Sequence, residues 1–252
     1  YSQVEIDDQH INVNRASPFF PERRKFFQEQ AGLFDFSLGL LSQLFYSRTI
    51  GIRDGELLPI IGGARITGKT GAWDVGLLSL QTARSTIEEE TNPSENFSVL
   101  RLRQKVINDR SFIGGMLTQR TRPDYFNTAV GVDGVIHVGN DHFLIGSLST
   151  MLEGERYSQA DYDPLQNTRL ALLWDKRKRD GWFYRQLYEF SGEQYNPGMA
   201  FLLREKHHNF YTDLSYGKFR ESRQQGLFQY VRWRPINSDL YFTTDFADVL
   251  TW

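Results

Sequence analysis

PIIGGARITGKT (59–70) and GAWDVGLLSLQT (71–82) are the adjacent segments that decide the fold class of this chain. In the first segment, one row of alternate residues is apolar or small, whereas the other row carries Arg65. Gly68 and Gly71 lie where the two segments meet and predict a tight hairpin. Alternation with a period of two predicts β-strands that have one apolar face and one polar face.

The same alternation continues toward the C-terminus. In residues 98–106, Leu100 and Leu102 share one face of the expected strand, and the charged residues share the other. The charged set is Arg101, Arg103 and Lys105. Arg185 and Glu189 alternate with apolar residues in the same way. Such charges are expected to line a wet interior, where they pair across strands or flank water.

Residues 129–138 predict the orientation of one strand. Its apolar row is Val130, Val132, Ile136 and Val138. We expect this row to face lipid, and Asp133 and His137 to face the interior. Val132→Arg is therefore expected to impair assembly far more than Asp133→Asn.

A series of similar segments predicts an all-β fold. The further segments are 112–120, 143–152, 168–176, 182–190, 200–207, 210–219, 226–234 and 239–246. Turn residues separate them, and no segment is apolar enough for a membrane helix. The expected architecture is an antiparallel transmembrane β-barrel of about 12–16 strands over residues 44–252, with strands starting near Leu44. Residues 83–96 are expected to form a polar loop.

Composition is compatible with such a barrel and with one alternative. The 252 residues include no Cys, 14% aromatic residues and a net charge of −2, with a mean hydropathy of −0.49. Aromatic girdles at two lipid interfaces would use the aromatic residues, and a polar lumen would explain the low hydropathy. The charge balance gives no indication of nucleic-acid binding. A soluble, aromatic-rich β-sandwich remains open on composition alone.

The first 43 residues are polar and irregular and form an expected lead-in to the barrel. Four phenylalanines, Phe19, Phe20, Phe26 and Phe27, surround a charged run. A free tail would expose these rings to water, so we expect residues 16–36 to pack on the inner wall or at the periplasmic mouth as a plug. The expected lumen or plug residues are Glu22, Arg23, Glu29, Arg48, Arg65, Lys69, Arg101, Arg103, Asp133 and His137. Among them, Arg48, Arg65 and Lys69 are expected to pair with Glu22 or Glu29.

Motifs for catalysis or cofactor binding are weak in this chain. GARITGKT (63–70) matches the phosphate-loop pattern, but the residues after it look like a strand, whereas a phosphate loop opens a helix. The five histidines lack metal-ligand spacing, and no nucleophile–base set is identifiable. Asp161 and Asp163 are read as a solvated loop in preference to a calcium or sugar site. We therefore expect no enzyme activity, cofactor or metal.

Several segments resemble a bacterial family known as domain of unknown function 5916. They are SQVEIDDQHINVNR (2–15), FFPERRKFFQEQAGLFDF (19–36), LFYSRTIG (44–51), IIGGARITGKTGAWDVGLLSLQT (60–82) and, more loosely, NFSVLRLRQ (96–104) and FLLREKHHNF (201–210). The resemblance implies an outer-membrane β-barrel of Bacteroidota-like bacteria. Family members usually carry an N-terminal module similar to a carbohydrate-binding domain, which this sequence lacks, so its start is expected to lie inside a longer protein.

The expected function is that of an outer-membrane β-barrel acting as a channel, a scaffold or a subunit of an uptake or surface complex. The expected partners are outer-membrane lipid and other outer-membrane or surface proteins, with a glycan as a further candidate. The alternative is a soluble β-rich glycan-binding protein or hydrolase.

Overall fold

The computed structural model describes residues 19–36, 42–53, 56–87, 90–155, 162–178, 180–219, 230–243 and 249–251. Within these ranges the helices are short: α1 (Lys25–Gln28), η1 (Ala31–Leu33) and η2 (Ser47–Thr49). None of the described helices has the length and apolarity needed to cross a membrane. Strands make up most of the fold, so the all-β prediction is confirmed.

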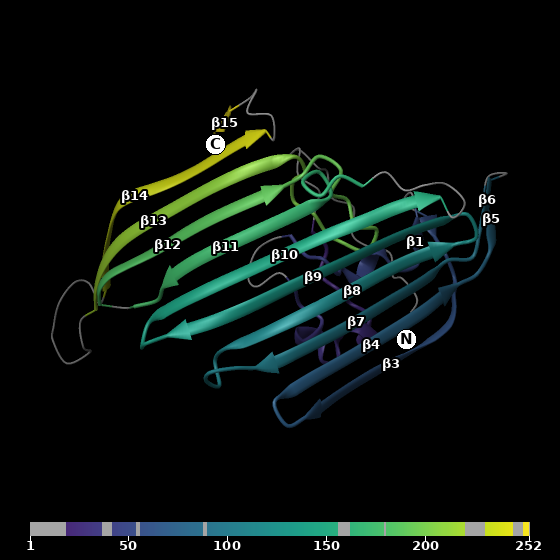
Figure 1. Ribbon diagram of the computed structural model, residues 1–252, viewed down its shortest axis with the longest axis horizontal. Coiled ribbons are helices and arrows are strands. Elements are labelled where there is room, and N and C mark those ends of the chain that lie inside the picture. The colour runs from purple at the N-terminus through teal and green to yellow at the C-terminus, as the bar shows by residue number, and fades with distance from the viewer. Residues whose placement is uncertain are drawn as a thin grey trace.

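Eleven strands form one sheet in which every neighbouring pair is antiparallel (Figure 1). In spatial order they are β15 (Val249–Thr251), β14 (Tyr230–Thr243), β13 (His207–Phe219), β12 (Gly181–Ser191), β11 (Thr168–Lys176), β10 (His142–Glu155), β9 (Tyr125–Val138), β8 (Phe112–Arg122), β7 (Asn96–Lys105), β4 (Trp73–Thr82) and β3 (Ile60–Thr70). β3 and β15 end the sheet and are not paired with each other in the described residues, so the described sheet is open rather than closed into a ring.

Two short hairpins lie outside the main sheet. β1 (Ile52–Arg53) pairs with β2 (Glu56–Leu57), and β5 (Ser85–Ile87) pairs with β6 (Glu90–Asn92). The second hairpin occupies the region expected to be an irregular loop at 83–96. The described strands therefore number fifteen, of which eleven belong to the sheet.

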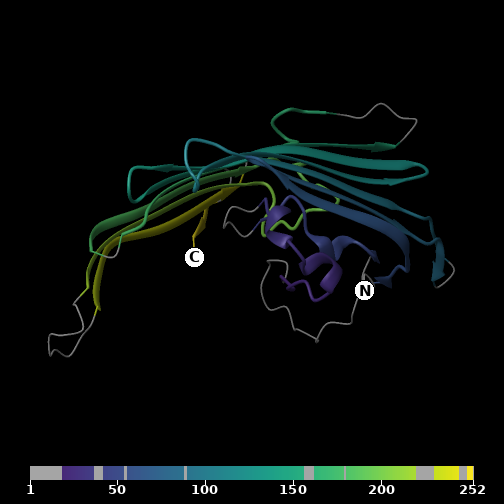
Figure 2. The same ribbon diagram turned by 90° about the horizontal axis from the view of Figure 1, so that it is seen from below.

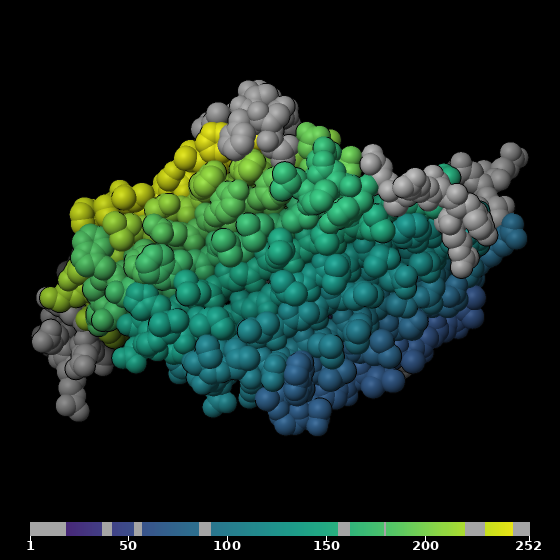
Figure 3. Space-filling model, in the orientation of Figure 1, coloured from purple at the N-terminus to yellow at the C-terminus, as the bar shows by residue number. Residues whose placement is uncertain are grey.

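The sheet is strongly curved. Figure 2 shows it arching over the N-terminal segment, which lies against the concave face. On the convex side, seen in Figure 3, the strands of the sheet form the molecular surface. Curvature therefore gives the two faces different surroundings: one encloses a segment of the chain, and the other faces outward.

Alternation assigns the apolar rows to the convex face. In β9, Val130, Val132 and Val138 are about half exposed, whereas Asp133 on the concave side is only 4% exposed. The predicted separation of these rows onto opposite faces is thus confirmed, whereas contact of the apolar row with lipid stays a prediction. The apolar side chains exposed on strands β3 to β10 include Ile66, Leu77, Leu100, Leu102, Ile113, Leu117, Leu144 and Leu148.

Three boundaries differ from those expected from the sequence. The sheet begins at Ile60 and not near Leu44, because residues 44–51 contain η2 and pack with the lead-in. Residues 200–207 were expected to form a strand, but residues 200–206 form an irregular connection that includes one isolated bridge, from Phe201 to Gln43, and β13 begins only at His207. The described parts of the segments 226–234 and 239–246, residues 230–234 and 239–243, belong to one strand, β14, rather than two, and the rest of both segments lies outside the described residues.

Glycine shapes the predicted hairpin between β3 and β4. Gly71 has φ +58°, a left-handed conformation that side chains with a Cβ rarely adopt. Thr70 pairs with Trp73 across this turn, and Lys69 forms an ion pair with Asp74 at 3.2 Å. The segment with the phosphate-loop pattern is thus an extended strand followed by a tight turn and another strand.

Candidate functional site: the concave face and its lead-in

Residues 19–36, here called the lead-in, lie against the N-terminal half of the concave face (Figure 2). Phe27, Phe34 and Phe36 are buried there. They join one hydrophobic cluster with residues on the concave face of the sheet, which is here called the wall. These wall residues come from β4, β7, β8, β9 and β10 and are Leu78, Leu80, Phe97, Val99, Met116, Ala129 and Met151. Burial of large aromatic rings contributes roughly 1.5–3 kcal/mol each, so this cluster is a main source of lead-in stability.

Two wall glycines make room for lead-in rings. A Cβ at Gly76 would lie 2.8 Å from Cζ of Phe34, and a Cβ at Gly131 would lie 2.6 Å from Cζ of Phe36. Both distances are shorter than ordinary carbon contacts, so any side chain at either position would displace the ring. The absence of a side chain is therefore what allows the rings to lie directly on the wall.

Arg65 of β3 binds the backbone and a side chain at the helical turn α1. Its Nη1 donates to the carbonyl oxygens of Phe26 and Glu29, the latter at 2.7 Å, and its Nη2 donates to Glu29 Oε2 at 2.8 Å. The guanidinium group also lies over the Phe26 ring. The predicted pairing of Arg65 with Glu29 is thus confirmed, although Glu29 itself is largely exposed.

Arg101 and Asp133 form an ion pair beneath the lead-in. Their side chains are fully buried, with Nη1 to Oδ1 and Nη2 to Oδ2 distances of 2.6 Å. Arg101 also donates to the carbonyl oxygens of Leu33 and Asp35, each at 3.1 Å. The pair therefore fixes both the wall and the backbone of the lead-in, and paired burial is what makes a charged group tolerable there.

Arg103 adds a further contact from β7. Its Nη1 donates to the Gly32 carbonyl oxygen at 3.0 Å, and its guanidinium lies 3.8 Å from the Phe112 ring centroid. Arginines from two wall strands, β3 and β7, thus bind carbonyl groups of an irregular segment that makes few hydrogen bonds of its own.

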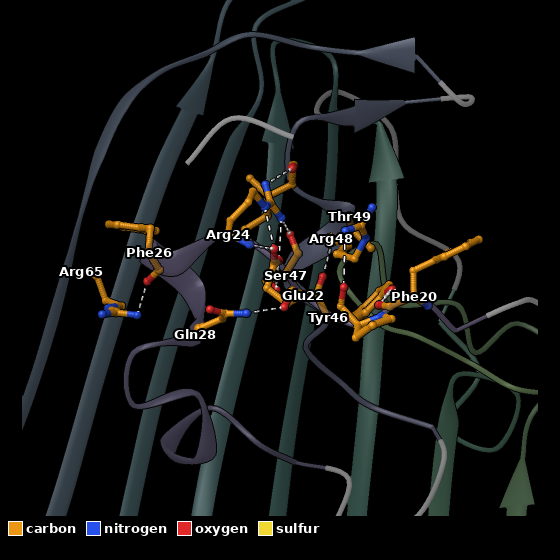
Figure 4. Close-up of polar contacts among 12 residues, drawn as sticks. Phe20, Glu22, Arg24, Phe26, Gln28, Tyr46, Ser47, Arg48, Thr49 and Arg65 are labelled. Atoms are coloured by element: carbon orange, nitrogen blue, oxygen red, sulfur yellow. Dashed lines mark hydrogen bonds and ion pairs between the residues drawn. The ribbon is translucent and has the colours of Figure 1, made fainter. Parts of the chain in front are cut away.

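A second set of contacts joins the lead-in to residues 42–51 (Figure 4). Arg24 makes a two-pronged contact with Glu22, at 2.9 and 2.8 Å, and donates to the carbonyl oxygens of Ser47 and Ile50. Ser47 Oγ donates to Glu22 as well. Arg48 is buried and donates to the Pro21 carbonyl oxygen at 3.4 Å. These contacts fold two stretches of irregular chain into one unit.

This arrangement lowers the pKa of Glu22. Burial acts to raise that pKa, but hydrogen bonds from Arg24 and Ser47, together with the charge of Arg24, outweigh it. Glu22 is consequently held as a carboxylate in the folded chain.

The remaining predicted residues lie elsewhere. Lys69 pairs with Asp74 rather than with a glutamate of the lead-in. Arg23 is exposed, and its neighbour Arg24 takes the buried position. His137 lies near the end of β9, where the centroid of its ring is 4.6 Å from that of the Phe143 ring and the two rings are tilted.

The C-terminal half of the concave face carries a polar tract that sequence reasoning found only in part. Arg185 and Glu189 were expected to line the interior, but most of their partners were missed. The ion pairs are Arg169–Glu189, Arg177–Asp175, Arg185–Asp175, Arg232–Asp213 and Arg234–Asp213. The signal was present as alternation in β11, β13 and β14, whereas pairing across strands requires the register.

A further set of ion pairs that the sequence did not indicate joins the start of β7 to the C-terminal end of β8. Glu95 is fully buried and binds Arg120 at 2.8 Å and Arg122 at 3.3 Å. Because Glu95 precedes the strand, alternation could not indicate its direction.

No group of three potential metal ligands occurs in the described part of the chain. Asp163 accepts hydrogen bonds from the backbone of Leu165 and Gln166, so it caps a turn. Asp161 lies outside the described residues. Comparison of the chain with family models, curated proteins and solved structures finds no match, so the resemblance to domain of unknown function 5916 stays a prediction.

Proposed function

We propose that this sheet is part of the wall of a bacterial outer-membrane β-barrel, with its convex face in lipid and its interior partly filled by the lead-in. The observation that carries the proposal is the inverted polarity of the sheet. Charged residues such as Arg101, Asp133 and Arg169 are buried on the concave side, whereas large apolar residues are exposed on the convex side. Soluble proteins rarely expose a large continuous apolar surface, because it promotes association in water.

Strand length supports the same proposal. The ten strands β3, β4 and β7 to β14 each contain 9–14 residues. A tilted strand crosses the hydrocarbon core of a bilayer with about 9–11 residues.

Two aromatic clusters lie at opposite ends of the strands on the convex face. At the end that contains the β11–β12 turn, Trp174 packs on Tyr184, and Trp182 packs on Tyr216 and Trp233. At the other end the clustered rings are Tyr188, Phe190, His208, Phe210 and Phe242. On the described strands β11 to β14, no carboxylate or guanidinium lies between these clusters on that face. Aromatic residues at both interfaces are typical of outer-membrane barrels.

The lead-in restricts what such a barrel does. Its aromatic rings and the arginines that hold it occupy the concave face along β3 to β10, so a wide, permanently open pore is disfavoured. A scaffold, or a gated subunit of an uptake or surface complex, fits this arrangement better.

Fractionation tests the proposal against the soluble alternatives. The chain, expressed with an export signal, should be found in outer-membrane fractions, resist extraction by carbonate and require detergent. Folded protein should migrate differently on a gel before and after boiling. A chain that stays monodisperse in buffer without detergent would overturn the proposal in favour of a soluble β-rich protein.

A further inference from the structure

A cavity of about 290 Å³ lies on the concave face beside Ser42, over strands β11 to β14. Ser42 and Leu203 close one side, and the wall supplies Leu173, Leu187 and Tyr211. Its size is near the lower end of the range for small-molecule sites, roughly 300–1,000 Å³. Neither the lead-in contacts nor the wall ion pairs described above fill this cavity.

Two buried polar atoms at the cavity have no hydrogen-bond partner among the described residues. They are Oδ1 of Asn209 and Nδ1 of His207, and each of these residues is only 3% exposed. Both side chains come from β13 and line the cavity. Because buried polar atoms are nearly always hydrogen bonded, two open positions in one cavity indicate a ligand that supplies the missing partners. An amide oxygen accepts only, so Asn209 needs a donor such as a hydroxyl group.

The guanidinium groups of Arg177, Arg185 and Arg204 line the cavity against two carboxylates, those of Glu189 and Asp239, and this excess of positive charge favours an anion. Arg177 and Arg185 both bind Asp175, at 2.7 and 3.2 Å, so one carboxylate faces two guanidinium groups. Glu189, at the cavity wall, is already paired with Arg169. Arg177 and Arg185 both line the cavity, and each side chain is about half exposed. Guanidinium groups bind carboxylate or phosphate through paired hydrogen bonds.

Aromatic surface completes the lining. Tyr211 and Tyr241 both border the cavity, and Arg204 lies 4.6 Å from the centroid of the Tyr241 ring. Tyrosine offers an apolar face with a polar edge, which suits a ligand that has both C–H and hydroxyl groups.

We propose that this cavity binds a small hydroxylated anion, in which a carboxylate or phosphate is accompanied by hydroxyl groups, as in an acidic monosaccharide. The anionic group binds Arg177 and Arg185, and hydroxyl groups satisfy Asn209 and His207. The inference goes beyond the membrane proposal and does not depend on it, because the cavity needs only the folded concave face.

Calorimetric titration of the folded full chain tests the site, in detergent or in buffer as solubility requires. Glucuronate is the probe, and glucose, which lacks the charge, and acetate, which lacks the hydroxyl groups, are the comparisons. Glucuronate should bind at least about tenfold more tightly than either comparison, with an affinity that falls as salt is added. Equal affinity for glucuronate and glucose, or no binding of glucuronate at millimolar concentration, would overturn the proposal.

Variants locate the binding. Asn209→Leu removes the open acceptor at similar volume, and Arg185→Gln removes one guanidinium; each should weaken glucuronate binding about tenfold. Arg234→Gln is the matched control, because Arg234 belongs to the same charged tract but does not line the cavity. Circular dichroism verifies that every variant is folded, whether the chain is in detergent or in buffer. Equal weakening by Arg185→Gln and Arg234→Gln would indicate general charge attraction and refute a defined site. If fractionation shows that the chain is not in the membrane, the binding result is unaffected, so each proposal can be refuted without the other.

Discussion

At the scale of single residues, Asp133 has a larger role than its sequence context indicates. Its alternation predicts a side chain that faces a wet interior, where Asp133→Asn would be mild. The structure instead buries it fully against Arg101. Breaking a buried ion pair costs about 3–5 kcal/mol, because the remaining charge has no partner. Asp133→Asn should therefore lower the free energy of unfolding by about 3 kcal/mol.

Urea unfolding of the purified variant measures this effect. The double variant Arg101→Met with Asp133→Leu is the control, because it removes both charges and should recover part of the loss. Unchanged stability of Asp133→Asn would show that the pair contributes nothing and that Arg101 finds another partner.

Val132 tests the opposite face of the same strand. The side chain is 55% exposed on the convex surface. If that face lies in lipid, Val132→Arg should cost about 2–4 kcal/mol at the bilayer midplane and reduce the folded fraction assembled into membranes. Val132→Leu keeps the position apolar and should assemble normally. Normal assembly of Val132→Arg in vesicles would place this face in water.

At the scale of elements, the lead-in behaves as a packed segment whose attachment depends on Arg65. Arg65→Gln removes the charge that binds Glu29 and weakens the hold on two carbonyl groups. Trypsin should then cut after exposed Lys25 several-fold faster than in the unchanged chain, because local opening becomes easier. Lys105→Gln on β7 is the control, since Lys105 pairs only with nearby Asp109 in the described contacts. Identical cleavage rates for both variants would contradict the role of Arg65.

Glu22 makes the same element sensitive to acid. Its pKa is lowered in the folded chain, so the stabilisation is complete above the unfolded value of about 4.3 and is lost as pH falls through the folded pKa. Amide exchange in residues 19–28, corrected for intrinsic rates, should show protection that decreases between about pH 5 and pH 3. In Glu22→Gln the protection should start lower and change little over that range. A wild-type chain whose protection is constant to pH 3 would refute the linkage.

Sequence patterns identified most strands but not the contacts of the lead-in. Alternation located β7 to β13, because each strand has one apolar and one polar row. It did not distinguish Arg23 from Arg24, since both lie in irregular chain just before α1, where the direction of a side chain depends on packing and not on a period of two. The strands were expected to start near Leu44, but residues 44–51 contain η2 and bind Arg24 and Glu22 of the lead-in. The charge pairs on β11 to β14 depend on strand register, which a sequence alone does not give.

At the scale of the whole molecule, the concave face is divided into two halves. The half along β3 to β10 is covered by aromatic rings, and the half along β11 to β14 carries arginine–carboxylate pairs and the cavity. If the sheet lines a barrel in a planar bilayer, the unchanged chain should show little steady current. The combined variant Arg65→Gln with Arg103→Gln loosens the lead-in and should raise the current several-fold, with anions carrying more of it than cations. A large, steady current through the unchanged chain would contradict the plug.

The glycines beneath Phe34 and Phe36 have a consequence for assembly. Gly76 is on β4 and Gly131 is on β9, and β7 and β8 lie between them. A two-residue slip anywhere in this set would present Ala129 or Asp133, in place of Gly131, to the Phe36 ring, and the lead-in could not dock. The N-terminal segment can therefore dock only when these four strands are paired in the correct register. A docked lead-in therefore indicates that β4, β7, β8 and β9 are paired in their native register.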